Sequence, residues 1–223
     1  MNGIFVAGTD TNVGKTIASA SAMNILRGAE DICYWKPVQT GIETDDDTRT
    51  VRELANCSAD EFFDSGFRLE KPLSPHLSAR LAGVSITIEK ILDFVRNTNN
   101  EKFWIIEGAG GVLVPLNDTE LMIDLMRALN LPIVVAARSG LGTINHTLLT
   151  LQSLRNGGLE ILGVIMNGVP NEENRWAIEH FGATKVLAQI PKFDMLNAES
   201  LKTWAGKNSH NLCAAVRRRN SVL

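Results

Sequence analysis

Short apolar runs, rich in β-branched and aromatic residues, alternate along the chain with longer segments in which apolar positions recur every three to four residues. The short runs predict β-strands and the longer segments predict amphipathic helices. Strands are predicted at residues 4–7, 32–35, 103–106, 132–136, 161–166 and 186–190. Helices are predicted at residues 14–27, 47–56, 76–82, 88–97, 120–129, 144–156 and 172–181.

The predicted strands contain almost no polar residues, which is typical of strands buried on both faces of a parallel sheet. Because helices alternate with these strands, the sequence predicts an α/β fold with a mostly parallel central sheet and helices on both faces. With 44% apolar residues, a chain of 223 residues can bury one substantial core. Since no internal repeat or low-complexity linker divides the chain, residues 1–223 are expected to form a single domain.

The charge pattern argues against nucleic acid and membranes as partners. The formal net charge is −3 and the sequence pI is about 5.8, so no broad basic field is available to attract polyanions. The single basic run, at 216–219, is interpreted as a solvated chain end. The longest apolar stretch, 131–137, is far shorter than the ~20 residues that a membrane-spanning helix needs.

The cysteines and the first residues of the chain indicate the cellular compartment in which the protein is expected. The three cysteines are odd in number and lack metal-ligand spacing, and residues 1–3 do not open a charged, apolar signal segment. We therefore expect a reduced, cytoplasmic protein.

The stretch GTDTNVGKT, at 8–16, follows the first predicted strand and opens the first predicted helix. It resembles a phosphate-binding loop with one residue too many between its glycines, so that Thr9 stands where the usual pattern has glycine. Gly14 would let the backbone approach phosphate, Lys15 would face the β- and γ-oxygens, and the Thr16 hydroxyl could bind Mg²⁺. A glycine turn with a capping threonine is the plain alternative, but the order of strand, loop and helix favours nucleotide binding.

Two further predicted strands end in charged residues that would lie near this loop. The segment KPVQTG at 36–41 leaves Lys36 at a strand end, where it is either a surface cation or a phosphate contact. Glu43 and the acids at 45–47 precede a predicted helix, so one can cap the helix and another can bind Mg²⁺. Glu107 ends another strand, ahead of a glycine-rich stretch, and resembles a Walker B acid.

Together these motifs resemble the dethiobiotin synthetase family. The matching residues are GTDTNVGKT at 8–16, KPVQTG at 36–41, SPH at 74–76, EGAGG at 107–111, LGTINH at 141–146 and the asparagine at 167. They span most of the chain in the family's order and spacing, whereas no motif is recognised after about Pro191.

The resemblance implies a P-loop NTPase-like fold and a reaction that depends on ATP and Mg²⁺. In that reaction 7,8-diaminononanoate and CO₂, or bicarbonate supplying it, give dethiobiotin, ADP and phosphate through a carbamate and a carbamic-phosphoric anhydride. The resemblance also implies a homodimer whose active sites lie at the interface.

The family's pattern implies a role for each matching residue. The catalytic residues would be Thr11, Lys15 and Lys36. The ATP-binding residues would be Asn12, Val13, Gly14, Lys15, Thr16, Ile17 and Asn167, of which Asn167 would read adenine. The metal ligands would be Thr16, Glu107 and Asp47, with Asp46 as the alternative to Asp47. The substrate-binding residues would be Asn12, Thr40 and Asn145, with Asn145 reaching the partner subunit's substrate.

Plain alternatives remain for two of these residues. Asn167 can simply end a strand and Asn145 can simply cap a helix. Asn12 departs from the pattern, because many family members have glutamate at its position.

Three other kinds of nucleotide-binding protein are alternatives to this function. A nucleotide switch of the partitioning or septum-placement type shares the fold but carries Lys-Gly-Gly before the Gly-Lys-Thr, where this chain has residues 11–13, Thr-Asn-Val. A GTP-binding switch usually has Asn-Lys-x-Asp after a late strand, where residues 167–170 read Asn-Gly-Val-Pro. A family relative that uses ATP with a different acceptor stays open.

Overall fold

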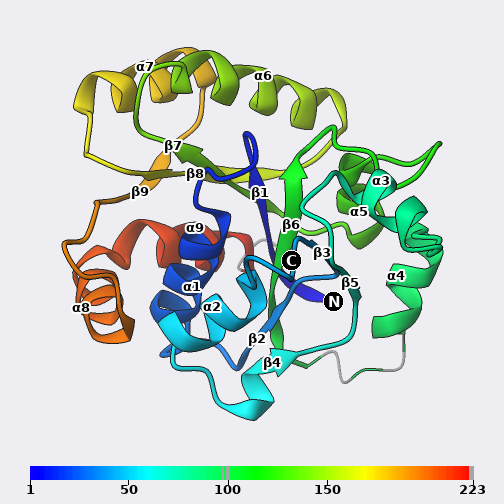
Figure 1. Cartoon of the computed structure of the whole chain (residues 1–223). Coiled ribbons are helices and arrows are strands. Elements are labelled where there is room, and N and C mark those ends of the chain that lie inside the picture. Colours follow the sequence, from blue (N-terminus) through cyan, green and yellow to red (C-terminus); the bar gives the residue numbers. More distant parts are fainter. Residues whose placement is uncertain (97, 99–100, 221–223) are drawn as a thin grey trace.

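The computed structural model describes residues 1–96, 98 and 101–220, and its centre is a seven-stranded sheet (Figure 1). The strand order is β4-β2-β6-β1-β7-β8-β9, and every neighbouring pair is parallel. The strands are β1 (Asn2–Gly8), β2 (Ile32–Trp35), β4 (Phe62–Phe63), β6 (Phe103–Gly111), β7 (Ile133–Arg138), β8 (Ile161–Asn167) and β9 (Val186–Ile190). The predicted parallel sheet is confirmed.

Helices cover both faces of this sheet, as predicted (Figure 1). One face packs against α1 (Lys15–Leu26), α2 (Asp47–Leu54), α8 (Ala198–Asn208) and α9 (His210–Asn220). The other face packs against α3 (Pro75–Leu81), α4 (Ile88–Val95), α5 (Met122–Leu129), α6 (Thr143–Asn156) and α7 (Glu172–Gly182). Within the described part of the chain, no helix combines the length and apolar character needed to cross a membrane.

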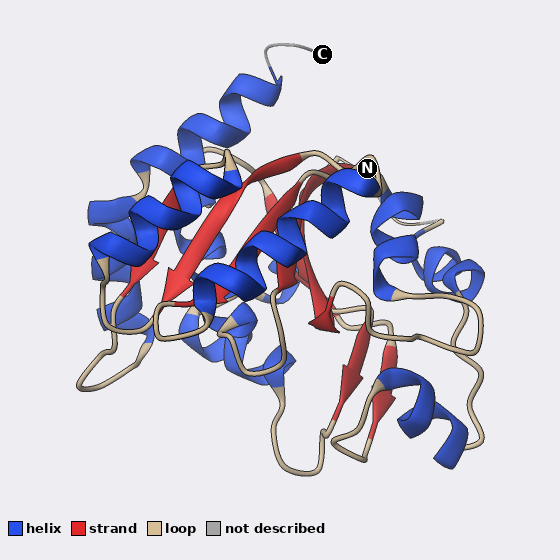
Figure 2. Ribbon diagram, turned by 90° about the horizontal axis from the view of Figure 1, so that it is seen from above, coloured by secondary structure: helices blue, strands red, loops and turns tan. Residues whose placement is uncertain are grey.

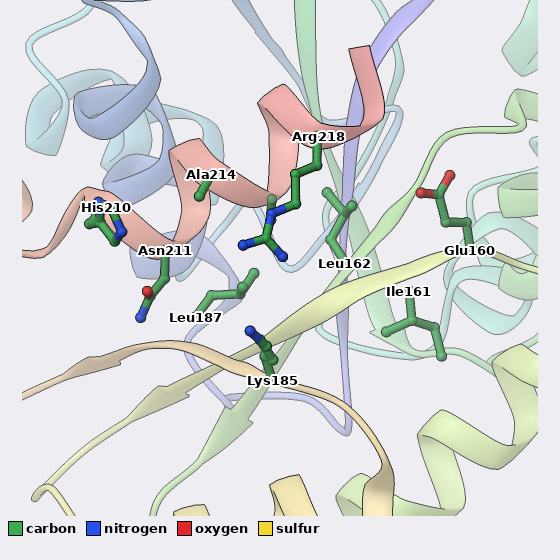
Figure 3. A pocket seen from close by; sticks show the side chains of 10 residues that line it. Glu160, Ile161, Leu162, Lys185, Leu187, His210, Asn211, Ala214 and Arg218 are labelled. Carbon is green, nitrogen blue, oxygen red and sulfur yellow. The ribbon is translucent and has the colours of Figure 1, made fainter. Parts of the chain in front are cut away.

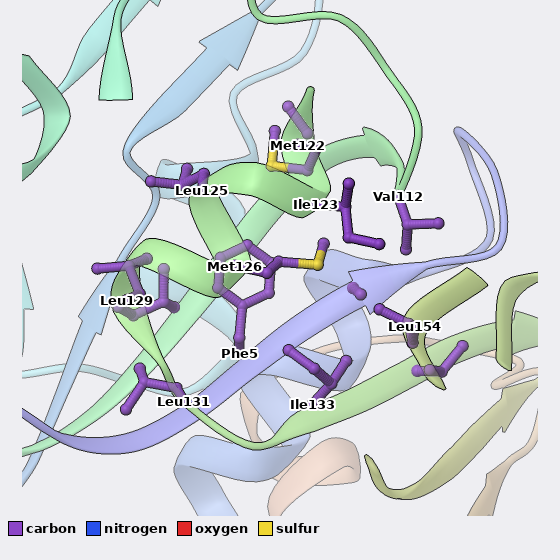
Figure 4. Close-up of a cluster of buried hydrophobic side chains, with 14 of the residues drawn as sticks. Phe5, Val112, Met122, Ile123, Leu125, Met126, Leu129, Leu131, Ile133 and Leu154 are labelled. Atoms are coloured by element: carbon purple, nitrogen blue, oxygen red, sulfur yellow. The ribbon is translucent and has the colours of Figure 1, made fainter. Parts of the chain in front are cut away.

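Alternation along each strand divides the core into two layers, because successive side chains point to opposite faces. On β1, Phe5 joins the layer beneath α5 and α6, whereas Ile4 and Val6 join the layer beneath α1. Figure 4 shows Phe5 among Met126 and other apolar side chains of the first layer. Burying one such large side chain contributes about 1.5–3 kcal/mol, which is why the strands of this sheet are apolar on both faces.

A small second sheet was not predicted. It joins β3 (Val38–Thr40) to β5 (Phe67–Leu69) in parallel and lies apart from the main sheet (Figure 2). Strand structure resumes just after Pro37, whose carbonyl accepts a hydrogen bond from Phe67 N at 2.8 Å. Strands this short carry too little alternation to be read from sequence, and the same holds for β4.

The glycine-rich stretch after Glu107 is also strand rather than loop. β6 runs to Gly111 because Val6 pairs with Glu107 and Gly8 pairs with Gly111, across an irregularity in register. Glu107 therefore lies within a central strand and not at its end.

The C-terminal segment carries structure that the sequence did not reveal. Helices α8 and α9 pack on the α1 face, where Leu201 and Leu212 are fully buried. Val216 is only 3% exposed, so the interpretation of 216–219 as a solvated end is wrong for this residue. The predicted helix 88–97 ends at Val95, and residue 97 lies outside the described residues.

Candidate active site

A cleft of about 820 Å³ lies at the carboxyl ends of β1 and β2, the edge of a parallel sheet where ligands usually bind. Its walls include most of the residues expected at the site: Thr11, Asn12, Gly14, Lys15, Thr16, Ile17, Lys36, Thr40 and Asp47. These residues come from three separate segments of the chain, and the fold brings them together.

The loop after β1 is shaped around the Lys15 side chain. Lys15 begins α1 and folds back so that its Nζ donates a hydrogen bond to the Asp10 carbonyl at 2.9 Å. A Cβ at Gly8 would lie 2.9 Å from Lys15 Nζ, so only glycine leaves room for this lysine. Gly14 has a φ of 87°, which glycine adopts without strain. The loop is thus closed by Gly8 and Gly14, and the additional residue sits between them.

The backbone conformation at position 12 favours asparagine. Its φ of 56° lies in the left-handed region, which asparagine tolerates better than most residues. The side chain is exposed and lines the cleft. Next to it, Thr11 N donates to Asp10 Oδ1 at 2.7 Å, and Asp10 pairs with Arg138 of β7 at 3.1 Å. The tip of the loop is therefore tied to the neighbouring strand.

Four side chains form a compact cluster on the floor of the site. Lys36 Nζ lies 2.7 Å from Asp47 Oδ2 and 2.6 Å from Glu107 Oε1. Thr16 Oγ1 lies 2.7 Å from Asp47 Oδ1 and 3.3 Å from Glu107 Oε1. Lys36 is 2% exposed and Glu107 is fully buried, so Lys36 is not a surface cation.

The pKa values of the two lysines of the cleft are shifted in opposite directions. Burial lowers the Lys36 pKa, but Glu107 and Asp47 outweigh burial, and the pKa lies above its ordinary value. Burial and then the charge of Lys36 lower the Lys15 pKa to about 8. Burial also acts to raise the Asp47 pKa, yet Lys36 and Thr16 more than offset it and the pKa is lowered. Lys15 is therefore the cation with more to gain from a bound phosphate.

The two adjacent aspartates have different roles in the structure. Asp46 is the N-cap of α2, where it accepts from Arg49 N at 3.1 Å and from Gln39 Nε2 at 2.9 Å. Asp47 begins the helix and contacts Thr16 and Lys36 instead. The geometry thus groups Asp47, and not Asp46, with the other expected metal ligands.

Asn167 lies behind the loop, at the end of β8. Its Nδ2 donates to the Val13 carbonyl at 2.9 Å, and a Cβ at Gly14 would come within 2.8 Å of its Cγ. Its Oδ1 is buried and has no hydrogen-bond partner among the residues that the structure describes. A buried amide oxygen without a partner is costly, and a ligand amino group could satisfy it.

Besides Glu107 and Asn167, two further expected residues do not line the cleft. Val13 is buried behind the loop and presents its backbone carbonyl to Asn167. Asn145 is in the first turn of α6, is exposed and does not line the cleft of its own chain. Thr40, by contrast, ends β3 and lines the cleft.

Several residues near the site were not singled out from sequence. Tyr34 contacts Glu107 from within the core, and in the sequence it resembles any aromatic strand residue. Asp10 and Arg138 form their ion pair across 128 positions of the chain, a separation that no local pattern reveals. The wall at 72–75 includes part of the SPH motif, which was recognised without a role.

A second cavity, of about 520 Å³, lies at the opposite, amino ends of β8 and β9 (Figure 3). Lys185 and Arg218 extend into it from opposite sides, beside the apolar side chains of Leu162 and Leu187. None of the expected site residues lines this cavity, so the cleft at the carboxyl ends is the candidate active site.

The chain shares its fold with a ParA family ATPase and with a MinD protein. A ParA family ATPase from Chlorobium tepidum TLS superposes with a TM-score of 0.57 at 11% identity, over 92% of this chain and 97% of that one. The septum site-determining protein MinD from Pyrococcus horikoshii OT3, complexed with Mg-ADP, superposes with a TM-score of 0.55 at 14% identity, over 93% and 96%. At these identities the similarity shows the fold alone.

Comparison of sequences is more specific. The family model described as an AAA domain matches residues 2–200. The biotin biosynthesis bifunctional protein BioCD of Bordetella avium is 47% identical over 206 residues, which are 91% of this chain and 42% of that protein. The chain therefore spans less than half of this bifunctional relative.

Two relatives match over nearly their whole length. The ATP-dependent dethiobiotin synthetase BioD of Paramagnetospirillum magneticum is 46% identical over 201 residues, or 90% of this chain and 93% of that protein. The enzyme of the same name from Brucella ovis is 42% identical over 207 residues, or 93% and 94%. With the motifs at 8–16, 36–41 and 107–111 contributing to one cleft and relatives of this similarity, the chain belongs to the family of ATP-dependent dethiobiotin synthetases.

Proposed function

We propose that this protein is an ATP-dependent cyclo-ligase that converts 7,8-diaminononanoate and CO₂, or bicarbonate supplying it, into dethiobiotin, ADP and phosphate. The observation that carries the proposal is Lys36, a second buried lysine in the cleft of the phosphate-binding loop. A nucleotide switch needs the loop lysine, whereas phosphorylating a bound anion needs further positive charge near the γ-phosphate.

The proposed reaction has three steps. One amine attacks CO₂ and loses a proton, which gives a carbamate. A carbamate oxygen attacks the γ-phosphorus, ADP leaves, and a carbamic-phosphoric anhydride forms. The second amine attacks the carbonyl carbon, loses a proton and displaces phosphate, which closes the ureido ring.

The residues of the chain reduce charge repulsion and hold the reactants in line. Carbamate and γ-phosphate are both anions, so Lys15 and Lys36 would lower the barrier by offsetting their repulsion. Thr11, Asn12 and Thr40 line the same cleft and would orient the diamine for attack.

The cluster around Thr16 fits Mg²⁺. The Thr16 hydroxyl lies 2.7 Å from Asp47 Oδ1 and 3.3 Å from Glu107 Oε1, so these three residues offer hard oxygen donors in one place. When bound, the ion would neutralise charge on the β- and γ-phosphoryl oxygens. These three residues would hold it at the start of α1, where the helix dipole also favours phosphate.

The direct test is mass-spectrometric detection of dethiobiotin formed from diaminononanoate, bicarbonate, ATP and Mg²⁺. Product should exceed an enzyme-free control and should depend on ATP. ATP hydrolysis without dethiobiotin would instead support a switch, or a relative with a different acceptor.

Replacing Asn167 with alanine should weaken discrimination between ATP and GTP. Its buried Oδ1 can accept a hydrogen bond from the amino group of adenine, whereas guanine presents a carbonyl oxygen at the equivalent position. Loss of one such bond corresponds to up to about a tenfold increase in KM for ATP. The KM for GTP should change much less. Steady-state kinetics with both nucleotides checks this, and equal changes would contradict adenine reading.

We also propose a homodimer in which α6 contributes to the partner's site. Leu141 is fully exposed, and Asn145 and Leu149 follow at intervals of four residues, which places Asn145 and Leu149 on one helix face. Leu113 and Leu149, each 57% exposed, line a groove beside α5. An exposed apolar face of this kind suits a second copy of the chain.

For the dimer, light scattering should give a mass near twice 24.4 kDa. Leu149→Glu should shift the mass to that of a monomer, and Asn145→Ala should raise the KM for the diamine without dissociating the dimer. Trp176→Glu is the matched control, since Trp176 is also 57% exposed but lies on α7. A wild-type monomer at assay concentration would refute the shared site.

The remaining expectations complete the proposal. Residues 1–223 would act as one cytoplasmic domain whose partners are ATP, the diamine, CO₂ and a second copy of the chain. Neither nucleic acid nor a membrane would take part.

A further inference from the structure

Tyr34 lies within the core beside the proposed metal ligands and has no part in the reaction described above. Its side chain is fully buried on β2, and its hydroxyl donates a hydrogen bond to Glu107 Oε2 at 3.0 Å. The other carboxylate oxygen, Oε1, accepts from Lys36 Nζ at 2.6 Å and Thr16 Oγ1 at 3.3 Å. The two oxygens of Glu107 therefore have separate partners, one in the core and the others at the cleft.

Strand register explains why Tyr34 can reach Glu107. Tyr34 pairs with Ile105 on the adjacent strand β6, and side chains two residues apart share one face of the sheet. Glu107 is thus the diagonal neighbour of Tyr34, within reach of a long aromatic side chain. Lys36, two residues beyond Tyr34, reaches the same carboxylate from nearer the cleft.

Packing holds the tyrosine ring in place. Its centroid lies 5.1 Å from that of Phe62 on β4, and Arg52 lies over the Phe62 ring at 5.3 Å. A phenylalanine could fill nearly the same volume without burying a hydroxyl, which is unfavourable unless the hydroxyl is hydrogen-bonded. The hydroxyl is therefore explained by the carboxylate and not by packing.

We propose that Tyr34 is a positioning residue that fixes the rotation of the Glu107 carboxylate and so holds Oε1 toward Thr16 and the cleft. The inference rests on the proposed function, because it takes Glu107 as a ligand of the divalent cation bound with ATP. The terminal torsion of glutamate is broad, so without Tyr34 the carboxylate would sample other rotations. Groups that orient a metal ligand typically change metal affinity or activity by 10–100-fold.

The test is Tyr34→Phe, which removes one oxygen atom and keeps the ring. Mn²⁺ titrations followed by electron paramagnetic resonance, with a non-hydrolysable ATP analogue present, report metal affinity without turnover. We expect the Mn²⁺ dissociation constant to rise about tenfold. The affinity for the analogue in the absence of metal should be unchanged.

The matched control is Phe62→Leu, which loosens the packing around the same ring but leaves the hydroxyl. It should lower the melting temperature and leave Mn²⁺ affinity near that of the wild type. Unchanged Mn²⁺ affinity in Tyr34→Phe, or an equal loss in Phe62→Leu, would overturn the positioning role.

The two proposals can fail separately. If the wild type binds Mn²⁺ with the analogue and Tyr34→Phe weakens it, but no dethiobiotin forms, the proposed reaction fails while the positioning role stands. If the wild type binds no Mn²⁺ with the analogue, the metal site and the positioning role both fail.

Discussion

Replacing Lys36 with methionine is expected to lower turnover roughly 10³-fold and to destabilise the fold as well. Removing one partner of a buried ion pair leaves the other charge uncompensated, at a cost of about 3–5 kcal/mol. In this protein Lys36 is the cation between Asp47 and Glu107, so both carboxylates lose their counter-charge. In a chain of this size the melting temperature should fall by about 10 °C.

The destabilisation by Lys36→Met should depend on pH. The lowered Asp47 pKa depends on Lys36, so this pKa should rise in the variant. At pH 8 Asp47 stays ionised without its partner, whereas at pH 5 it can take up a proton and lose the unpaired charge. The difference in stability between wild type and variant should therefore be larger at pH 8 than at pH 5.

Steady-state kinetics and melting curves at both pH values check these results, with Lys102→Met as the control. Lys102 also lies between two acids, Asp31 and Asp60, at 3.3 Å from each, but these acids are more than 70% exposed. Exposed pairs contribute about 0–1 kcal/mol, so this variant should stay near wild type. Near-normal turnover in Lys36→Met would remove Lys36 from the proposed mechanism.

Replacing Lys15 with methionine should also lower turnover, by roughly 10²–10³-fold, but without destabilising the fold. Burial and the charge of Lys36 lower the Lys15 pKa to about 8, so its charge is unfavourable in the folded protein before phosphate binds. Below pH 8 the charged lysine costs stability, and this cost disappears as pH rises from 8 toward 10.5. A gain in stability from Lys15→Met should therefore be seen at pH 7 and be much smaller near pH 10.

Calorimetric titration with ATP and melting curves at pH 7 and pH 10 check this prediction. The variant should bind ATP more weakly, because the loop loses the cation that faces the phosphates. At pH 7 the two substitutions are expected to change the melting temperature in opposite directions, so the measurement distinguishes the roles of the two lysines. A drop in melting temperature as large as that of Lys36→Met would contradict the charge balance described for the cleft.

Fold similarity alone would not have led to this function. The ParA and MinD proteins share the fold at 11% and 14% identity. The distinguishing features are residues at the site: the Thr-Asn-Val segment at 11–13 and the buried cluster around Lys36. Function in this fold is decided by the strand ends and not by the sheet.

Much of the sheet could be predicted because each long strand corresponds to a run of consecutive apolar residues in the sequence. The apolar runs at 32–35 and 186–190 match β2 and β9 in full, since β-branched and aromatic residues suit strands buried on both faces. The short strands β3, β4 and β5 escaped, because two or three residues cannot display a period. Helices α8 and α9 were not predicted, because their segment carries no motif and their apolar positions serve packing against α1.

The sequence by itself determined the α/β class, the irregular phosphate-binding loop and the identity of the charged residues at the strand ends. These features are encoded within a few consecutive positions, as in GTDTNVGKT and KPVQTG. Only the tertiary structure decided that Asp47 joins the cluster while Asp46 caps a helix, and that Tyr34 reaches Glu107. It also decided that Lys36 is ion-paired with two carboxylates, whereas Lys15 donates to a backbone carbonyl. The physical reason is that burial and charge pairing in this cluster depend on residues as far apart as Thr16 and Glu107, 91 positions apart in the chain, which strand pairing and helix packing bring within hydrogen-bond distance.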